Sequence, residues 1–276
     1  RYIEAARAEI DCEIFTVYDK SGLEFVRDTL REHGAKSVGF VDKVVTVDLF
    51  NWYKRVFGEE TQLLPIGGLL EVQRTVKTEY ELDMIKKAQS IGDAAFEHIL
   101  TVLHPDMTEI EVALELEFFM RKMGSEGIAF DTIAVSGTMS ARPPGEPRPV
   151  KLEKGFLTMD FGARVNGYCS DMTRTVALGT CSDKQREIYD IVLSAQLAGL
   201  KAVYAGNTCR AADAAARDVI AAAGYGAYFG HSLGHGVGLA VHGAPTFSPK
   251  SDFVLEENMV VTVEPGIYLP GEFGVR

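Results

Sequence analysis

Two aspartates, Asp160 and Asp171, flank an Asn-Gly dipeptide in the segment MDFGARVNGYCSD. Asn-Gly between two alternating runs is typical of a hairpin with a two-residue turn. A turn at Asn166-Gly167 pairs Asp160 with Thr173 and, because side chains alternate along a strand, places both carboxylates on one face. Diagonal neighbours on that face lie about 7–8 Å apart at Cα, within reach of two metal ions about 3.5–4 Å apart. The hairpin therefore predicts a dinuclear metal site; an exposed face with two acids is the alternative.

The opposite face of the predicted hairpin is apolar: it carries Leu157, Met159, Phe161, Ala163 and Val165. Gly162 lies opposite Asp171 and is expected to leave room beside it. The tripeptide Asp-Phe-Gly at 160–162 also occurs in protein kinases. A kinase interpretation is disfavoured, because the chain has no Gly-rich loop with a following strand lysine and no His-Arg-Asp segment before residue 160.

Three histidines, His231, His235 and His242, lie in the glycine-rich segment GHSLGHGVGLAVHG. The spacing of the first two would place them on one face of a helix, but the glycines between them disfavour a helix. Because glycine lets backbone segments approach closely, we expect a loop and a strand that pass a site. A partly buried side chain without a chemical role is the alternative for any one of them.

The segment MVVTVEPGIY predicts a strand in which Glu264 interrupts a valine-rich run. Burial of a carboxylate is costly unless the group is paired or bound to a metal; an acid on an edge strand is the alternative. Two aspartates, a histidine and a buried glutamate form an oxygen-rich ligand set with one nitrogen donor. Such a set suits manganese, cobalt, zinc or iron(II) better than a thiolate site does.

The elements that must position these residues follow from strand, helix and capping signals. Strands over 13–19 and 37–42 alternate with helices over 21–33 and 47–57, which predicts a small α/β unit. The segment LLPIGGLL is a candidate boundary. Beyond it, capping residues and helical periodicity predict helices, and alternation predicts strands. The helices are expected over 78–103, 108–124, 182–204 and 208–224, and the strands over 130–135, 156–165 and 168–178.

Composition restricts the class of partner. The chain of 276 residues has a net charge of −11, which argues against nucleic acid as a partner, since phosphate binding needs a basic face. No apolar run approaches the roughly 18 residues of a membrane span, so no membrane partner is expected. The four cysteines are scattered without a C-x-x-C pair. Free thiols in a reducing compartment are therefore expected, which favours a cytoplasmic protein.

Three ordered segments, MDFGARVNGYCSDMTRTVALG, GHSLGHGVGLAVHGAP and MVVTVEPGIYLPGEFGVR, resemble the signature segments of the pita-bread metallopeptidases. The most similar branch is the Xaa-Pro peptidases, aminopeptidase P and prolidase, with creatinase as a relative. The resemblance covers most of the chain. It implies an α+β pita-bread catalytic domain over 74–276, preceded over 1–73 by a small, incomplete creatinase-like α/β domain.

The resemblance also implies ligands, cofactors and roles. Asp160, Asp171, His235 and Glu264 would hold two divalent ions, manganese in the first instance, with cobalt or zinc as alternatives. A hydroxide bridging the metals would attack the Xaa-Pro bond at the N-terminus of peptides or in dipeptides, and Glu264 would move the proton. His242 would stabilise the tetrahedral intermediate, and His231 would help to position the substrate. The partners expected are peptides with proline at the second position and, in a homodimer, a second copy.

Two departures from the family pattern leave other functions open. A fifth ligand, a glutamate, is expected two residues beyond the Gly-Val-Arg that ends the chain, so the catalytic domain is expected to continue past Arg276. Pro144 stands where the family has a substrate-binding histidine, and a proline side chain can neither donate nor accept a proton. The alternatives are therefore an impaired pseudo-peptidase that binds peptides or proteins, and a metal-free, creatinase-like hydrolase.

Overall fold

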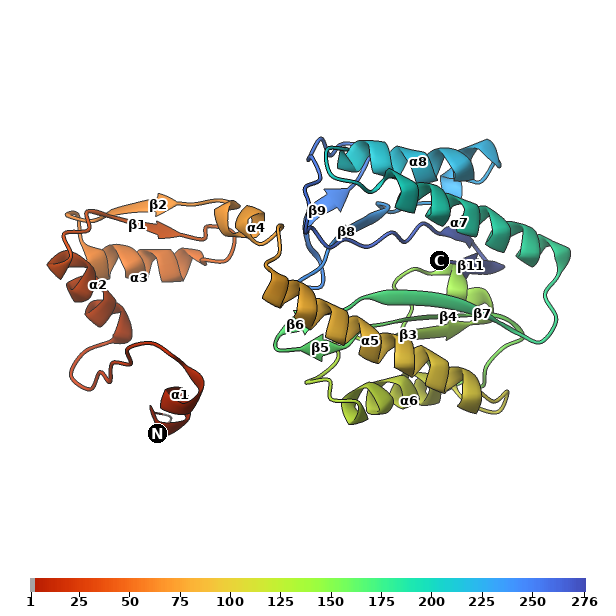
Figure 1. The fold of residues 1–276 in the computed structure, drawn as a ribbon, viewed down its shortest axis with the longest axis horizontal. Helices are drawn as coiled ribbons and strands as arrows, with labels where there is room; N and C mark the ends of the chain where they lie inside the picture. The colour runs from red at the N-terminus through yellow and green to blue at the C-terminus, as the bar shows by residue number, and fades with distance from the viewer. Residues whose placement is uncertain (1–2) are drawn as a thin grey trace. The chain divides into compact units, whose positions relative to one another are not determined.

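The computed structural model describes residues 3–276 and divides into two compact units (Figure 1). One unit ends at Leu70, and the other comprises Glu71–Arg276. The described part of the first contains three helices, α1 to α3, and a parallel pair of strands, β1 and β2. Its elements are α1 (Ile3–Glu9), α2 (Gly22–Glu32), β1 (Ser37–Phe40), α3 (Val47–Phe57) and β2 (Gln62–Pro65), and the short α4 (Leu69–Gln73) begins at its end.

The first unit follows the predicted order with two differences. The helices α2 and α3 and the strand β1 lie where they are predicted, and Ser21 with Glu24 forms the predicted capping box. The strand predicted over 13–19 is wrong: these residues form no strand in the structure. Strand β2 occupies part of the segment taken as a break. Alternation alone predicts a strand only where a partner is available, and here the partner of β1 is β2. That this unit is part of a creatinase-like domain stays a prediction.

All four helices predicted for the second unit are confirmed. The longer two, α5 (Glu79–Val102) and α7 (Asp183–Ala202), are each followed by a helix of 14 residues, α6 (Glu109–Lys122) and α8 (Cys209–Ala222). Capping boxes begin three of them, where a Ser or Thr hydroxyl accepts from the N3 amide and the N3 side chain returns the bond. Thr208 caps α8 with a single bond from Ala211.

Three antiparallel strands form the central sheet in the order β3-β4-β7. These are β3 (Ile133–Ser136), β4 (Gly155–Phe161) and β7 (Met172–Leu178). The short strands β5 (Arg164–Val165) and β6 (Tyr168–Cys169) continue the hairpin, and two further antiparallel pairs lie later in the chain. The first pair is β8 (Gly234–Gly236) with β9 (Gly243–Phe247), and the second is β10 (Ile267–Leu269) with β11 (Phe273–Val275).

Two cores hold the second unit together, and Figure 1 shows the strands between the pair α5 and α6 and the pair α7 and α8. The first core joins α5 and α6 to β4, and Leu157, Met159 and Phe161 are fully buried in it. The second joins α7 and α8 to the late strands through Ile220 and Phe247. Each fully buried large side chain contributes about 1.5–3 kcal/mol, so the two cores fix the sheet edges that carry the candidate site.

The two halves of this unit repeat one local arrangement. Thr108 forms an isolated β-bridge with Lys151 before α6, and Thr208 forms one with Val254 before α8. In each half, the first amide of the short helix also donates to the carbonyl of the residue just before the bridge partner. Glu109 donates to Val150, and Cys209 donates to Phe253. Both helix N-termini are thus anchored in the same way, although their sequences differ.

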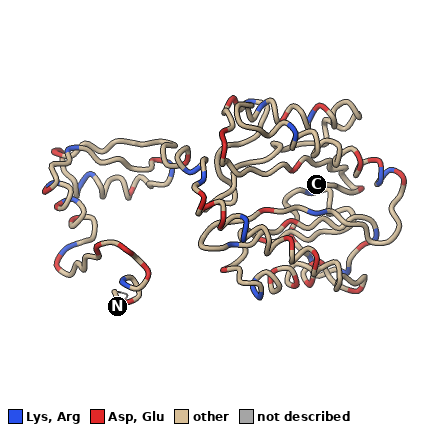
Figure 2. The backbone as a smooth tube through the Cα atoms, viewed as in Figure 1, with Lys and Arg blue, Asp and Glu red and all other residues tan. Residues whose placement is uncertain are grey.

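Charge and helix character agree with the composition. Figure 2 shows lysines and arginines interspersed with the more numerous acidic residues along both units. None of the helices in the described part of the chain is both long and apolar enough to cross a membrane.

Candidate metal centre

The hairpin forms with the predicted turn and register. Asn166 and Gly167 have positive φ angles of 47° and 80°, as the two central residues of a tight hairpin turn require. Asp160 pairs with Thr173, and the same register continues to the pair Val165 and Tyr168. The apolar face packs into the first core as predicted. Asp160 and Asp171 therefore share the face that turns away from that core.

Gly162 has a different role from the predicted one. A Cβ at this position would lie 2.0 Å from the backbone oxygen of Ser170, so any side chain would collide with the opposite strand. The glycine is required because the two strands approach so closely here, not because a side chain beside Asp171 needs room. The close approach still serves the site, since it fixes the strand just before Asp171.

The histidine segment is a loop followed by a strand, as predicted. His235 lies on β8, and Glu264 lies on an extended segment beside it: the amide of Thr262 donates to the His235 carbonyl at 2.8 Å, and the amide of Glu264 donates to the Leu233 carbonyl at 2.8 Å. Before β10 this segment contributes isolated bridges at Met259 and Val261, so the predicted strand is realised as a hydrogen-bonded edge that precedes β10. These bonds place the Glu264 and His235 side chains together.

Glycines allow this close pairing, in agreement with the interpretation of the sequence. A Cβ at Gly234 would lie 2.1 Å from the backbone oxygen of Thr262, and one at Gly236 would lie 1.9 Å from that of Ala244. His235 sits between these two positions. Its backbone is therefore enclosed on both sides, which leaves its side chain little freedom of position.

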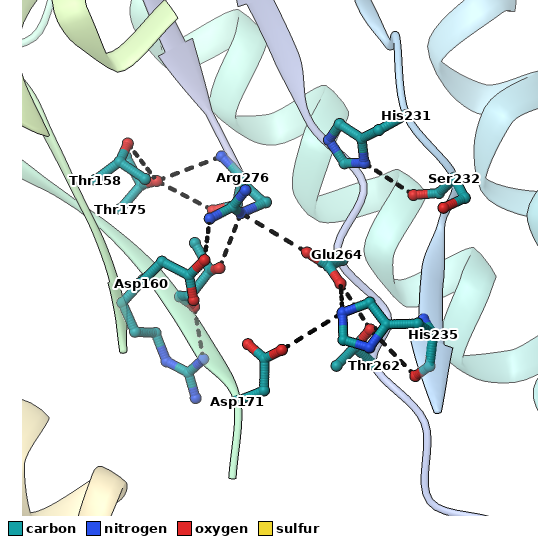
Figure 3. Close-up of polar contacts among 12 residues, drawn as sticks. Thr158, Asp160, Asp171, Thr175, His231, Ser232, His235, Thr262, Glu264 and Arg276 are labelled. Carbon is teal, nitrogen blue, oxygen red and sulfur yellow. Dashed lines mark hydrogen bonds and ion pairs between the residues drawn. The ribbon is translucent and has the colours of Figure 1, made fainter. Parts of the chain in front are cut away.

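Three of the four predicted ligands converge (Figure 3). The Nε2 atom of His235 is 3.2 Å from Glu264 Oε1 and 3.5 Å from Asp171 Oδ2. One ligand atom from each residue lies within 4.8 Å of the other two. His235 Nδ1 contacts the Gly236 carbonyl at 3.2 Å, and an N–H donated there leaves Nε2 for a metal, the usual arrangement at a metal-binding histidine. Thr262 donates to Glu264 Oε1 at 2.6 Å and orients that carboxylate.

Asp160, the fourth predicted ligand, stands beside this cluster and not within it. Its Oδ2 is paired with the guanidinium of Arg276, whereas its buried Oδ1 has no hydrogen-bond partner among residues 3–276. A buried carboxylate oxygen without a partner is costly, and a cation at this point would satisfy it. The orphaned oxygen, together with the oxygen-rich cluster, fits a divalent metal site.

The electrostatics of the cluster agree with a site that binds a cation. Burial, together with the charges of Asp160 and Glu264, raises the pKa of Asp171 to about 7. Burial also raises the pKa of Asp160. Burial opposes the shift at His235, but its hydrogen bond and charge interaction with Glu264 outweigh it and raise the pKa of the imidazole. The raised pKa values of these three groups mean that the site favours bound positive charge, as a proton or as a cation.

Comparison with known proteins decides the family. The model of metallopeptidase family M24 matches residues 83–276. The chain belongs to metallopeptidase family M24. Membership confirms the family predicted from the three motifs, and with it the metallopeptidase class and the pita-bread-like α+β fold.

Solved structures of M24 proteins are similar over the whole chain. The structure described as Xaa-Pro dipeptidase from Bacillus anthracis is 46% identical with a TM-score of 0.95, and the similarity covers 100% of this chain and 77% of that one. An X-Pro aminopeptidase from Thermotoga maritima is 41% identical with a TM-score of 0.93, over 100% and 78%. In both, about a fifth or more of the known structure lies outside the matched part.

Curated M24 relatives agree. An uncharacterized peptidase of Bacillus subtilis, YqhT, is 43% identical over 277 residues, which is 100% of this chain and 78% of that protein. The Xaa-Pro dipeptidase of Pyrococcus furiosus is 44% identical over 212 residues, which is 76% of this chain. The matched part is 61% of the Pyrococcus protein, less than two thirds of its length.

The remaining two predicted site residues of this M24 chain differ in exposure. Both nitrogens of His231 are engaged: Nδ1 donates to the Ser232 carbonyl and Nε2 accepts from the Tyr268 hydroxyl, each at 2.8 Å. Burial lowers the pKa of His231, which fits this neutral form. His242 is exposed, and its ring centroid lies 4.6 Å from that of His235. His242 thus adjoins the candidate ligand cluster of Asp171, His235 and Glu264, whereas His231 faces Tyr268.

Two residues that the sequence interpretation missed support the histidine loop. Asp213, on α8, has an almost fully buried side chain, and it pairs with Arg217 one turn later. Both bind backbone groups of the segment that carries His231. The available signal was an aspartate at a position that falls on the apolar face of an alanine-rich helix, next to Ala212 and Ala216 in the core. Burial there demands a partner, which the arginine four residues on supplies.

Proposed function

We propose that this chain is the catalytic part of a dinuclear-metal peptidase that hydrolyses the Xaa-Pro bond at the N-terminus of peptides or in dipeptides. The observation that carries the proposal is the convergence of Asp171, His235 and Glu264, whose ligand atoms lie within 4.8 Å of one another. Similarity to proteins named Xaa-Pro dipeptidase and X-Pro aminopeptidase supports the substrate class.

The residues present fit two divalent ions. Asp171, His235 and Glu264 would hold one ion, and Asp160 with Asp171 the other. When bound, such ions act as Lewis acids and lower the pKa of coordinated water toward neutrality. Carboxylates and a single imidazole suit manganese, with cobalt or zinc as alternatives. Asp160 must release Arg276 from one oxygen to bind an ion with both.

The side chains divide the remaining work. Burial raises the pKa of Glu264, but hydrogen bonds from His235 and Thr262 outweigh this effect and lower the pKa below its usual value. This carboxylate is therefore ionised at neutral pH and can accept a proton. His242, exposed beside His235, can stabilise negative charge that develops on the substrate carbonyl. His231, held by Ser232 and Tyr268, helps to seat the substrate.

The test compares matched substrates on the full-length protein. Leu-Pro, Leu-Pro-Gly and Leu-Gly are incubated with protein loaded with manganese, cobalt or zinc, and with protein treated with chelator. We expect metal-dependent release of leucine from the two proline peptides and little from Leu-Gly. Two bound metal ions without turnover of any Xaa-Pro peptide would overturn the proposal. The ratio of Leu-Pro to Leu-Pro-Gly turnover separates dipeptidase from aminopeptidase specificity.

Pro144 favours a second candidate, a module that binds peptides without cutting them. Pro144 is exposed on the loop after the 3₁₀ helix Gly137–Ala141, and proline offers no proton-transfer group. Substitution Pro144→His discriminates. A large gain in rate identifies a weak enzyme, and a rate that stays at zero identifies a binding module. A metal-free hydrolase is disfavoured, because it gives no reason for the ligand cluster.

Two further properties belong to the same proposal. The protein is a homodimer, which sedimentation equilibrium tests directly. It is also cytoplasmic: Cys12, Cys169, Cys181 and Cys209 are free thiols, as is usual for proteins of reducing compartments. Fractionation of the source cells with activity measured on Leu-Pro tests the location.

A further inference from the structure

Helix α8 carries a buried ion pair outside the candidate ligand cluster. The Asp213 side chain is 1% exposed and that of Arg217 is 25% exposed. Arg217 Nε donates to Asp213 Oδ2 at 2.7 Å, and Arg217 Nη2 donates to Asp213 Oδ1 at 2.8 Å. Two parallel bonds between a planar guanidinium and a carboxylate fix both distance and orientation. The pair is therefore a rigid unit on the surface of α8 that faces the second core.

This unit reaches across to three backbone groups on alternate residues of one loop. Arg217 donates to the Phe229 carbonyl at 3.0 Å and to the His231 carbonyl at 2.8 Å. Asp213 Oδ1 accepts from the Leu233 amide at 3.0 Å. The same amide also donates to the Phe247 carbonyl at 2.9 Å. The guanidinium also lies 4.2 Å from the centroid of the Phe229 ring. The loop over 229–233 is thus fastened at both ends and at its centre.

The fastened loop carries one site residue and leads into another. His231 projects from its centre, and Leu233 accepts the amide of Glu264 before the chain enters β8 and reaches His235. Gly230 and Gly234 flank His231 and give the free loop wide backbone freedom. Side chains of α8 supply the restraint that the loop sequence lacks.

We propose that Asp213 and Arg217 are positioning residues that hold the His231 loop against α8. They thereby fix in one geometry both His231, beside Tyr268, and the start of β8, the strand that carries the candidate ligand His235. The inference rests on the proposed peptidase function for the role of His231. It adds that seating of a proline-containing peptide depends on an ion pair that touches neither substrate nor metal.

Kinetics of Arg217→Met, Arg217→Lys and the matched control Arg210→Met test this. Arg210 lies on the same helix in an exposed pair with Asp252, and such pairs contribute little. A displacement of about 1 Å costs on the order of 10²-fold, so we expect kcat/KM on Leu-Pro to fall about 10–100-fold in Arg217→Met. The change should be mainly in KM, as expected for lost substrate seating. Arg217→Lys keeps the charge but loses the planar guanidinium that makes two parallel bonds, so its kcat/KM should lie between those of Arg217→Met and the parent. Arg210→Met should have the kcat/KM of the parent.

Hydrogen exchange gives a readout that does not need activity. In Arg217→Met and in Asp213→Asn, amides of the segment 229–234 should exchange about tenfold faster or more, while those of β4 stay protected. Uniformly faster exchange, with kcat and KM unchanged in the folded fraction, would overturn the positioning role. If the parent protein cleaves no Xaa-Pro peptide, the proposed function fails, and local exchange in 229–234 still decides whether the pair holds the loop.

Discussion

The two halves of the Glu71–Arg276 unit position their candidate ligands by different means. In the first half, Asp160 and Asp171 lie on a single hairpin, whose register is set by the turn at Asn166 and Gly167. In the second half, His235 and Glu264 come from separate segments, which backbone hydrogen bonds join between strand β8 and the extended edge before Pro265. The first arrangement is local in sequence, and the second depends on tertiary pairing.

The halves also restrain their loops with different ion pairs. Glu109, fully buried at the start of α6, accepts from the amide of Ser136 at 2.7 Å and from the side chain of Arg148. Asp213 and Arg217 do the equivalent in the second half, but both lie on α8. Each half therefore places one buried carboxylate and one arginine between its short helix and a loop. Only the second pair binds the backbone of a predicted site histidine.

The largest expected effect tests whether both halves contribute metal ligands. Asp171→Asn removes the carboxylate charge that faces His235, and loss of several kcal/mol of metal-dependent stabilisation corresponds to roughly 10³-fold in kcat/KM. Steady-state kinetics on Leu-Pro and metal analysis check it, with Asp252→Asn, an exposed acid, as control. His235→Ala should cost as much. A variant in either half that keeps near-parental activity would show that the other half holds the metal alone.

The second prediction concerns the metal-free protein and its pH dependence. The pKa of Asp171 is about 7 in the folded protein but about 3.9 when unfolded. Between these values the folded state binds more protons than the unfolded state, so the free energy of unfolding falls as pH rises from about 4 to 7. The loss is up to about 4 kcal/mol at 1.36 kcal/mol per pKa unit. Asp160, whose pKa is also raised, acts in the same direction. The raised pKa of His235 adds to the loss only above about pH 6.5, and the lowered pKa of Glu264 adds an opposite slope only below about pH 4.5.

Urea unfolding in chelator at pH 5 and pH 7.5 measures this slope. Asp171→Asn should flatten this slope and should make the metal-free protein more stable at pH 7.5, although the same change is expected to lower kcat/KM. A chain that gains stability over this pH range without metal would show that the first-half carboxylates are not crowded as the structure indicates.

The third prediction tests the close backbone approaches that both halves share. Gly162→Ala and Gly234→Ala would place a Cβ about 2 Å from a backbone oxygen, that of Ser170 or of Thr262. Neither oxygen can move without shifting a strand, so each substitution should cost about 1–3 kcal/mol of unfolding free energy. Gly22→Ala, where nothing lies within 4 Å, is the control. A neutral Gly234→Ala alone would mean that the β8 edge is looser than the hairpin.

How much of this could be predicted from sequence follows the same division. The hairpin, its register and its apolar face were predictable, because Asn166-Gly167 and a period of two specify them locally. The glycine-rich loop and Glu264 could each be identified as site segments. Their contact could not be predicted, since it depends on hydrogen bonds between segments that are distant in sequence. The wrong strand over 13–19 and the missed β2 have the same cause. A strand needs a pairing partner, and its own sequence does not show which segment that partner is. The pairing of Arg276 with Asp160 is likewise non-local.

The smallest expected effect separates the halves at their helix caps. Thr108 accepts from the Glu111 amide at 3.2 Å, and the Glu111 carboxylate accepts from the Thr108 amide at 2.6 Å. Thr208 accepts from Ala211 at 3.2 Å without a reciprocal carboxylate. Loss of a threonine cap costs about 0.5–2 kcal/mol, and Thr108→Ala should lie in the upper part of that range because it also removes the bond that the Thr108 hydroxyl donates to Glu111 Oε2 at 2.9 Å.

Thr208→Ala should cost roughly half as much, and both variants should keep parental kinetics on Leu-Pro, because neither cap contacts a ligand. Urea unfolding at fixed pH in chelator resolves the difference, and Glu111→Ala removes the reciprocal bond in α6 while leaving the Thr108 cap in place. Equal costs for the two threonines would mean that the shared β-bridges to Lys151 and Val254, and not the side-chain caps, hold the two short helices in place.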